Sequence, residues 1–163
     1  ASRWPAVVRD SLRVGDRGAQ AYRYEVTLPD GAVHVVSTHL SSPRTALWSA
    51  RNGRFEELAP SVAQRAVESR ALALWTRGLE PLIVAGDFNI PYGALALRED
   101  WHHLNNAFEA RGMGFGFTMT AGRFAVRIDH VLSSRALQPL AVRIEGGFPS
   151  EHRPLIVDFA RMR

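Results

Sequence analysis

The residues best suited to chemistry stand at the end of one apolar stretch. Asp87 and Asn89 follow Leu82–Ala85, which comes after Pro81 and is typical of a short strand buried on both faces. Because residues two apart on an extended segment point the same way, the carboxylate and the amide would converge on one point. A phosphate, a water molecule or a metal ion would suit this pair. The alternative is an Asx turn that closes the strand.

Other polar residues occupy expected strands, strand ends or short loops: His39, Asp129 with His130, and Glu151 with His152. Asp129 needs a partner, because an unpaired buried carboxylate is costly. His152 is the expected partner, since a buried Asp beside a histidine orients the imidazole and stabilises its charged form. The alternatives are an ion pair of Asp129 with an arginine, a structural His39 and a solvated Glu151.

Composition limits the possible functions. The chain has 163 residues, of which 46% are hydrophobic and 22% charged, as expected for one globular domain covering residues 1–163. It has no cysteine, which excludes disulfides and thiolate chemistry, and no apolar run long enough to predict a transmembrane segment. All 20 basic residues are arginine, which excludes Schiff-base chemistry and a Walker-type phosphate loop. The net charge of +4 is only weak support for a nucleic-acid partner, and the compartment stays open.

Hydrophobic patterns predict an α/β chain whose strands position these residues. Strands are expected at Ala6–Val14, Ala21–Leu28, Ala32–Thr38, Leu82–Ala85, Arg123–Ser133, Leu140–Glu145 and Pro154–Phe159. His39 and Asp87 then follow two of these strands, whereas Asp129 lies within another.

One long helix is expected at Pro60–Arg77, and shorter ones at Ala94–Arg98 and Leu104–Arg111. In the long helix, Ser61 is the expected N-cap, and the apolar stripe consists of Val62, Ala66, Leu72 and Trp75. Gly112–Phe117 is too irregular for a strand.

The remaining segment, Ser41–Phe55, has no clean period and is expected to be a surface loop. It contains Trp48 among arginines, which could stack on a base, sit at a lipid interface or simply be solvated.

Four motifs occur in order between residues 38 and 154: Thr38-His39-Leu40, Gly86-Asp87-Phe88-Asn89, Arg127-Ile128-Asp129-His130-Val131-Leu132 and Ser150-Glu151-His152-Arg153-Pro154. Together they resemble the later motifs of the endonuclease/exonuclease/phosphatase family, which includes deoxyribonuclease I, abasic-site endonucleases, sphingomyelinases and inositol polyphosphate 5-phosphatases. The resemblance implies a deoxyribonuclease I-like four-layer α/β/β/α sandwich. Here that sandwich is only partly represented, as a mixed, mostly antiparallel sheet with flanking helices.

The resemblance also implies a metal-dependent phosphoesterase. The catalytic residues would be His39, Asp87, Asn89, Asp129 and His152. By this match, His152 is the base or electrostatic partner for the attacking water and Asp129 orients it. Asp87 positions or activates the nucleophile, Asn89 binds the phosphate or holds the water, and His39 contacts a phosphate oxygen or assists the leaving group. Glu151 helps bind Mg²⁺ or Mn²⁺, which suit oxygen and imidazole ligands in the absence of thiols.

Two features depart from the family pattern. Glu151 stands where the family usually has Asp, and the Asn and Glu of the family's opening strands have no counterpart before residue 38. We therefore expect the chain to be the carboxyl-terminal part of the domain, to need the missing amino-terminal half as a partner, and to be inactive alone. The substrate stays open between nucleic acid, phospholipid headgroup and inositol phosphate. A non-catalytic binding or scaffolding module on the same fold is the alternative function.

Overall fold

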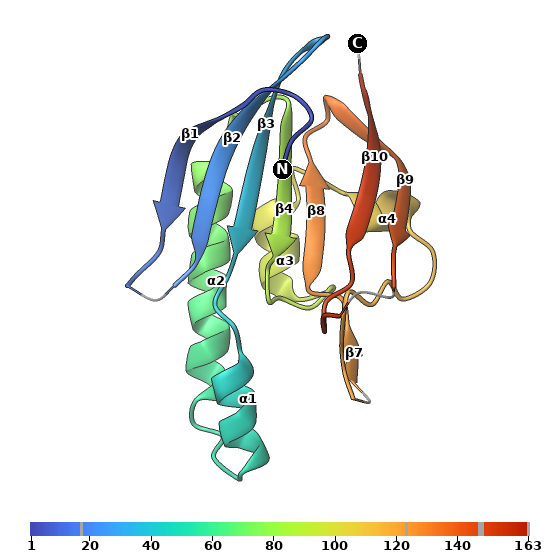
Figure 1. Ribbon diagram of the computed structural model, residues 1–163. Helices are drawn as coiled ribbons and strands as arrows, with labels where there is room; N and C mark the ends of the chain where they lie inside the picture. The colour runs from blue at the N-terminus through green and yellow to red at the C-terminus, as the bar shows by residue number, and fades with distance from the viewer. Residues whose placement is uncertain (17, 123, 147–148, 163) are drawn as a thin grey trace.

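The chain forms a large sheet with helices on one face and a small pair of strands beside it (Figure 1). The computed structural model describes residues 1–16, 18–122, 124–146 and 149–162. The large sheet has the order β1-β2-β3-β4-β8-β5. Its strands are β1 (Ala6–Arg13), β2 (Gln20–Leu28), β3 (Gly31–His39), β4 (Leu82–Asp87), β8 (Asp129–Ser133) and β5 (Asn105–Asn106). Within it, β3 and β4 run parallel and the other neighbours antiparallel, which confirms the predicted mixed, mostly antiparallel sheet.

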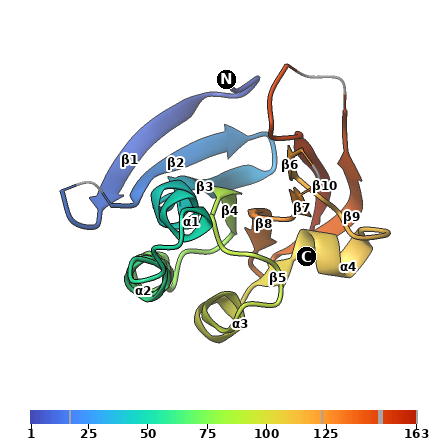
Figure 2. The same cartoon turned by 90° about the horizontal axis from the view of Figure 1, so that it is seen from below.

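Helices cover one face of this sheet. Figure 2 shows the helices α1 (Arg44–Arg51), α2 (Leu58–Trp75) and α3 (Leu95–Trp101) on the same side. The other elements are α4 (Ala107–Arg111), the paired strands β6 (Met119–Ala121) and β7 (Phe124–Val126), and the paired strands β9 (Leu137–Ile144) and β10 (Leu155–Arg161). No helix in the described ranges is long and apolar enough to cross a membrane.

The core lies between the sheet and the helices. Val36 of β3 and Val84 of β4 are fully buried, and they pack in one cluster with Leu72 of α2. Phe88, directly after β4, is also fully buried and meets Trp101 of α3 edge to face, with ring centroids 5.6 Å apart. Burial of these side chains fixes which face of each strand points toward the helices. The residues between them in sequence then point to the opposite face of the sheet.

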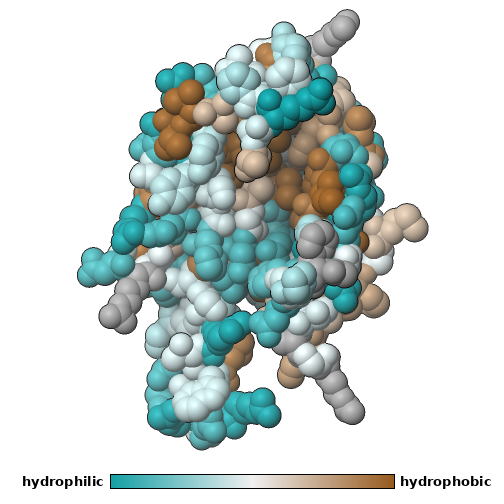
Figure 3. Space-filling model, viewed as in Figure 1, coloured by the Kyte–Doolittle hydropathy of each residue, from teal (hydrophilic) through white to brown (hydrophobic). Residues whose placement is uncertain are grey.

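The opposite face of the large sheet is open. Val8, Tyr24, Val35 and Ile83 are in register across four strands, and each is exposed or half-buried. On this side, apolar surface lies over the upper part of the sheet, and hydrophilic surface lies below the carboxyl ends of β3 and β4 (Figure 3). The sheet therefore has one covered face and one apolar face without a covering layer among the described residues.

The prediction of one strand over Arg123–Ser133 is wrong. Within the part that the structure describes, β7 ends at Val126, β8 begins at Asp129, and the two pair with different strands; Arg123 lies outside the described residues. The chain changes partner at this break because the hydroxyl of Thr118 accepts the amide hydrogens of Ile128 and Asp129, at 3.2 and 3.1 Å. Asp129 thus opens a strand instead of lying in the middle of one.

The prediction of a surface loop over Ser41–Phe55 is also wrong, because Arg44–Arg51 forms α1. Pro43 occupies the N-cap position of this helix. Ala46 and Ser49 are its buried residues, and the hydroxyl of Ser49 donates to Glu57 at 3.0 Å. Two small buried residues leave too weak an apolar stripe for the helix to be predicted from sequence.

The long helix is confirmed, but its cap and its buried face differ from the prediction. Helix α2 begins at Leu58 with Glu57 at the N-cap position, and Ser61 instead accepts a hydrogen bond from Arg65 at 2.8 Å. Val62 is 59% exposed, although it was expected in the apolar stripe. The buried face carries Arg65, Glu68, Ser69, Leu72 and Ala73, so more than half of it is polar. Gly112–Phe117 is irregular, as predicted.

Candidate active site

Strand register brings three of the predicted residues into one row. His39 at the end of β3 pairs with Asp87 at the end of β4, and Asp87 pairs with Asp129 at the start of β8. Residues in register on adjacent strands present their side chains to the same face at close range. The strands approach closely at Gly86, where a Cβ would clash with the carbonyl oxygen of Thr38. Glycine is therefore required at the position before Asp87.

His152 reaches this row from the segment between β9 and β10. Strand β6 holds that segment: Met119 forms a β-bridge with His152, and the Arg153 amide donates to the Thr118 carbonyl at 2.6 Å. Thr118 also accepts a hydrogen bond from the amide of Asp129. One residue therefore binds both the segment that carries His152 and the start of β8. The predicted Pro154–Phe159 strand is confirmed as β10, which pairs with β9.

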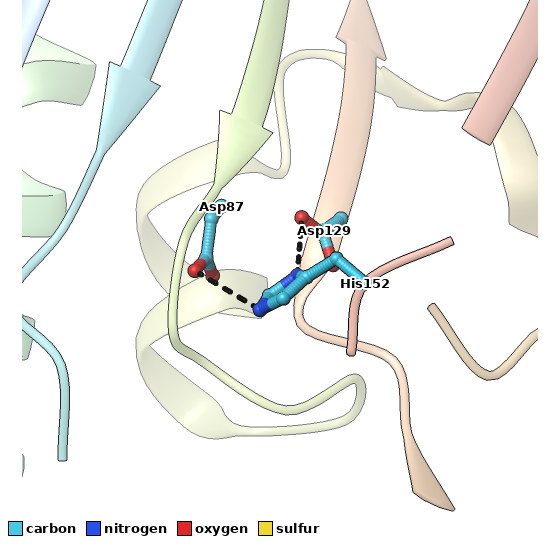
Figure 4. A group of neighbouring side chains, drawn as sticks. All are labelled: Asp87, Asp129 and His152. Atoms are coloured by element: carbon cyan, nitrogen blue, oxygen red, sulfur yellow. Dashed lines mark hydrogen bonds and ion pairs between the residues drawn. The ribbon is translucent and has the colours of Figure 1, made fainter. Parts of the chain in front are cut away.

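The imidazole of His152 lies between two carboxylates (Figure 4). Its Nδ1 lies 2.9 and 3.2 Å from the two oxygens of Asp129, and its Nε2 lies 3.9 Å from Oδ2 of Asp87. An ionised carboxylate can only accept hydrogen bonds, so Nδ1 carries the hydrogen and donates it to Asp129. The other nitrogen, Nε2, then presents its lone pair on the side of Asp87. The expected partnership of Asp129 with His152 is present in the structure.

The charged form of Asp87 is disfavoured in this site. Burial raises the pKa of its carboxyl above the ordinary value, and the charge of Asp129 adds to this effect. The backbone amide of Asn89 and the nearby imidazoles of His152 and His39 oppose the rise in pKa. His39 is 69% exposed, with Nε2 at 3.7 Å from Oδ2 of Asp87. The charge of Asp87 is therefore incompletely compensated within the described residues.

Asp87 forms the Asx turn that is the alternative interpretation of this pair, and Asn89 supplies the backbone amide. The φ of Asn89 is 50°, and its backbone amide donates to Oδ1 of Asp87 at 2.8 Å. Its side-chain amide donates to the carbonyl of Leu40 at 2.9 Å and to Oδ2 of Asp87 at 3.1 Å. Both amide hydrogens are thus used to hold Asp87 and the end of β3. The role of Asn89 in binding phosphate stays a prediction. It would require one of these two hydrogen bonds to open, because the side-chain Oδ1 can only accept hydrogen bonds and a phosphate oxygen needs a donor.

One group of carboxylates and imidazoles in the described ranges is close enough to share a metal ion. It consists of Asp87, Asp129 and His152, whose ligand atoms lie within 4.8 Å of one another. Glu151 lies outside this group and instead forms an ion pair with Arg44, with Nη2 and Oε2 2.8 Å apart. The role of Glu151 as a ligand for Mg²⁺ stays a prediction.

Comparison with protein-family models matches residues 1–152 to the Endonuclease/Exonuclease/phosphatase family. The chain belongs to this family. Members of the family are generally hydrolases that act on phosphoesters, and they typically use divalent metals. A comparison with curated protein sequences gives no match.

Solved structures of the family share the fold. An endonuclease/exonuclease/phosphatase from Beutenbergia cavernae DSM 12333 has a TM-score of 0.76 at 23% identity, and the match covers 98% of this chain and 46% of that one. D. rerio TDP2 complexed with a single-strand DNA product has a TM-score of 0.67 at 12% identity, covering 95% and 68% of the two chains. A mannosyl-6-phosphatase from Bacteroides thetaiotaomicron VPI-5482 has a TM-score of 0.53 at 14% identity, and the match covers 87% of this chain and 56% of that one. The chain thus spans less than half of the B. cavernae protein.

Sequence reasoning missed two residues that position this candidate site. Thr118 is fully buried and binds the backbone of Asp129, as described above. Glu68 of α2 is also fully buried, and it accepts hydrogen bonds from the amide and hydroxyl of Ser41 at 2.8 and 2.5 Å. Ser41 lies two residues after His39, so Glu68 fixes the segment that leaves β3. A charged residue on an expected helix offers no signal for such a contact, because its partner lies far away in sequence.

Proposed function

We propose that this chain carries the catalytic residues of a divalent-metal-dependent phosphoester hydrolase. The observation that carries the proposal is the Asp129–His152 hydrogen bond, which leaves Nε2 of the imidazole directed toward Asp87. This arrangement supplies an oriented base beside a second carboxylate. Attack of water on phosphorus needs such a base to accept the proton of the water.

The proposed reaction uses the residues of the row in distinct ways. A water molecule beside Nε2 of His152 would lose its proton to that nitrogen as its oxygen attacks phosphorus and the P–O bond to the leaving alcohol breaks. Asp129 would stabilise the imidazolium that forms and keep the ring in the productive tautomer. Asp87, held by Asn89, would accept the second hydrogen of the water and orient its lone pair. His39, exposed beside Asp87, would donate to a phosphate oxygen or to the leaving group.

The donor set of the site fits a hard divalent cation such as Mg²⁺ or Mn²⁺. The available ligands are carboxylate oxygens and an imidazole nitrogen, and the chain has no thiol. The raised pKa of Asp87 also indicates a carboxylate whose charge a cation would stabilise. We propose that Asp87 holds the ion, while Asp129 and His152 keep their hydrogen bond to each other. When bound, the ion would neutralise charge on the phosphate.

The proposal includes the remaining half of the family domain as a partner. Apolar side chains such as Tyr24, Val35 and Ile83 lie on a sheet face that no described layer covers. A second sheet packed on this face would complete the four-layer sandwich and bury that surface. We propose that residues 1–163 form the carboxyl-terminal part of the domain and that this part alone does not turn over substrate.

The test is hydrolysis of bis-p-nitrophenyl phosphate, with plasmid DNA in parallel, by the full family domain that includes this chain. Each assay is run with Mg²⁺, with Mn²⁺ and with EDTA. We expect metal-dependent turnover that His152→Ala abolishes. His102→Ala is the matched control, because His102 is an exposed histidine at the end of α3 and should leave turnover unchanged.

The outcomes separate the candidate functions. Cleavage of plasmid would favour a nucleic-acid substrate, as in the complex of TDP2 with a DNA product. Turnover of the small ester without plasmid cleavage would favour a smaller phosphoester, as the name of the mannosyl-6-phosphatase indicates for that protein. Turnover equal in the wild type and His152→Ala would refute the proposed mechanism.

A further inference from the structure

One ion pair joins two segments of the site that are far apart in sequence. Arg44 and Glu151 are 107 residues apart, and Nη2 of the arginine lies 2.8 Å from Oε2 of the glutamate. Glu151 directly precedes His152, and Arg44 follows His39 by five residues. The pair therefore connects the segment that leaves β3 with the segment that carries the histidine.

The backbone at Glu151 is fixed. Its carbonyl oxygen accepts a hydrogen bond from the amide of Thr120 in β6, at 2.9 Å. The next residue, His152, is held by its β-bridge to Met119 and by its hydrogen bond to Asp129. The backbone of Glu151 is thus held in place, while its side chain is 54% exposed. A group of this kind can hold a long, flexible partner in one place.

The segment before Arg44 is fixed as well. The amide of Leu40 donates to the carbonyl of Asp87 at 3.0 Å, and Ser41 is bound by the buried carboxylate of Glu68. Arg44 then opens α1. Its side chain is 76% exposed, so it reaches Glu151 through solvent at the rim of the site.

Most of the hydrogen-bonding capacity of Arg44 is unused. A guanidinium has five N–H donors, and the contact with Glu151 engages one nitrogen, Nη2. Its other donors have no partner among the described residues. A planar guanidinium can bind two oxygens of a phosphate while it keeps a carboxylate on another edge. The row of His39, Asp87 and Asp129 has two carboxylates, so an anionic substrate needs positive charge nearby.

We propose that Arg44 binds the phosphate group of the substrate and that Glu151 is the residue that positions Arg44. This inference rests on the proposed function only in taking a phosphate group as the ligand. It gives the glutamate a role other than metal binding and explains the departure from the family's Asp. An aspartate is shorter by one C–C bond, about 1.5 Å. From the same backbone position, and with Arg44 unmoved, it would lie beyond hydrogen-bonding distance of the guanidinium.

The experiment measures binding of inorganic phosphate to the 163-residue chain in EDTA, by titration followed with ³¹P NMR. Hydrolysis and the metal ion play no part, so an inactive protein still gives a decisive result. We expect millimolar binding by the wild type and an affinity lower by about tenfold in Arg44→Gln, as for loss of one charge-assisted contact. Arg51→Gln is the matched control: it removes an equal charge from the other end of α1 and should change the affinity by less than about twofold.

Glu151→Asp tests the positioning role, because it keeps the charge but shortens the side chain. We expect its phosphate affinity to fall by about threefold or more, while its Mn²⁺ affinity stays within about twofold of wild type. Both residues are exposed, so melting temperatures should not change. The proposal is overturned if the wild type does not bind phosphate, if Arg44→Gln loses no more affinity than Arg51→Gln, or if Glu151→Asp leaves phosphate affinity unchanged. A large change in Mn²⁺ affinity in Glu151→Asp would assign the glutamate to the metal instead.

Discussion

Replacing Asp129 with Asn tests the central hydrogen bond of the site. In the structure, Nδ1 of His152 lies 2.9 Å from Oδ2 of Asp129, and the two side chains are 36% and 21% exposed. A hydrogen bond to a charged group contributes about 1.5–3 kcal/mol, and partial exposure favours the lower end of that range. Loss of about 1.5 kcal/mol from the imidazolium in the transition state would slow turnover about tenfold.

The amide of Asn adds a second effect. Its NH₂ group can donate to Nδ1 of His152, which moves the ring hydrogen to Nε2 and removes the base from the side of Asp87. A positioned base contributes about 10²–10⁴-fold, so we expect kcat of Asp129→Asn to fall by about 10²-fold in total. Asp158→Asn, on the exposed part of β10, is the matched control and should leave kcat unchanged.

Two measurements check this reasoning. The first is kcat for bis-p-nitrophenyl phosphate in the full family domain, with the double variant of Asp129→Asn and His152→Ala expected to be no slower than His152→Ala alone. The second is the ¹⁵N chemical shift of the His152 ring in the 163-residue chain, which reports the tautomer without turnover. The reasoning is refuted if the variant keeps the wild-type tautomer and kcat falls by less than about threefold.

Three further predictions concern the residues that hold the site. Gly86→Ala should destabilise the fold by about 1–3 kcal/mol in urea unfolding, because its Cβ meets the Thr38 carbonyl, whereas Gly146→Ala has open space and should be neutral. Thr118→Val should destabilise the fold by about 1–3 kcal/mol and also slow turnover, because the buried amide of Ile128 and the partly buried amide of Asp129 lose their acceptor. Thr27→Val, on β2, is the comparison, and equal melting temperatures of the two variants would contradict this prediction. Burial lowers the pKa of His130 from 6.5 to about 4. Through this residue, the free energy of unfolding should therefore be lower at pH 4 than at pH 6.5 by about 3 kcal/mol. The unfolded state takes up the proton first as the pH falls, so His130→Asn should flatten the pH dependence of stability over that interval.

The positions of the candidate-site residues could be predicted from sequence because short strands and their ends set them. Asp87 follows an apolar strand, and His39 follows another, so both were expected at a sheet edge before their register was known. Parallel pairing of β3 and β4 then places the two residues side by side. Asp129 and His152 were paired by their chemistry, since a buried carboxylate needs a partner. Local patterns and the general requirements of burial thus determine these positions.

The errors arose where distant contacts decide the local structure. The strand expected over Arg123–Ser133 breaks because the hydroxyl of Thr118 binds two amides, and no pattern within that stretch reports this contact. The apolar stripe expected on the long helix is only partly right: Leu72 is buried, but Val62 is exposed and the buried face also carries Glu68, whose carboxylate is satisfied by Ser41. A buried polar group costs little once its hydrogen bonds are made, so hydrophobicity alone does not identify the inner face of α2.

Glu151 shows how the same limit applies to a motif. A family pattern compares residue types at one position, and there Glu differs from Asp by one methylene group. The contact that uses this methylene is made with Arg44, on a helix that sequence did not predict. The consequence of having Glu at this position therefore depends on α1 and on how closely α1 approaches the segment that carries His152. Only the three-dimensional structure supplies these two facts. In this candidate site, strand ends bring the carboxylates and imidazoles together, while contacts between distant segments decide which charges lie beside them.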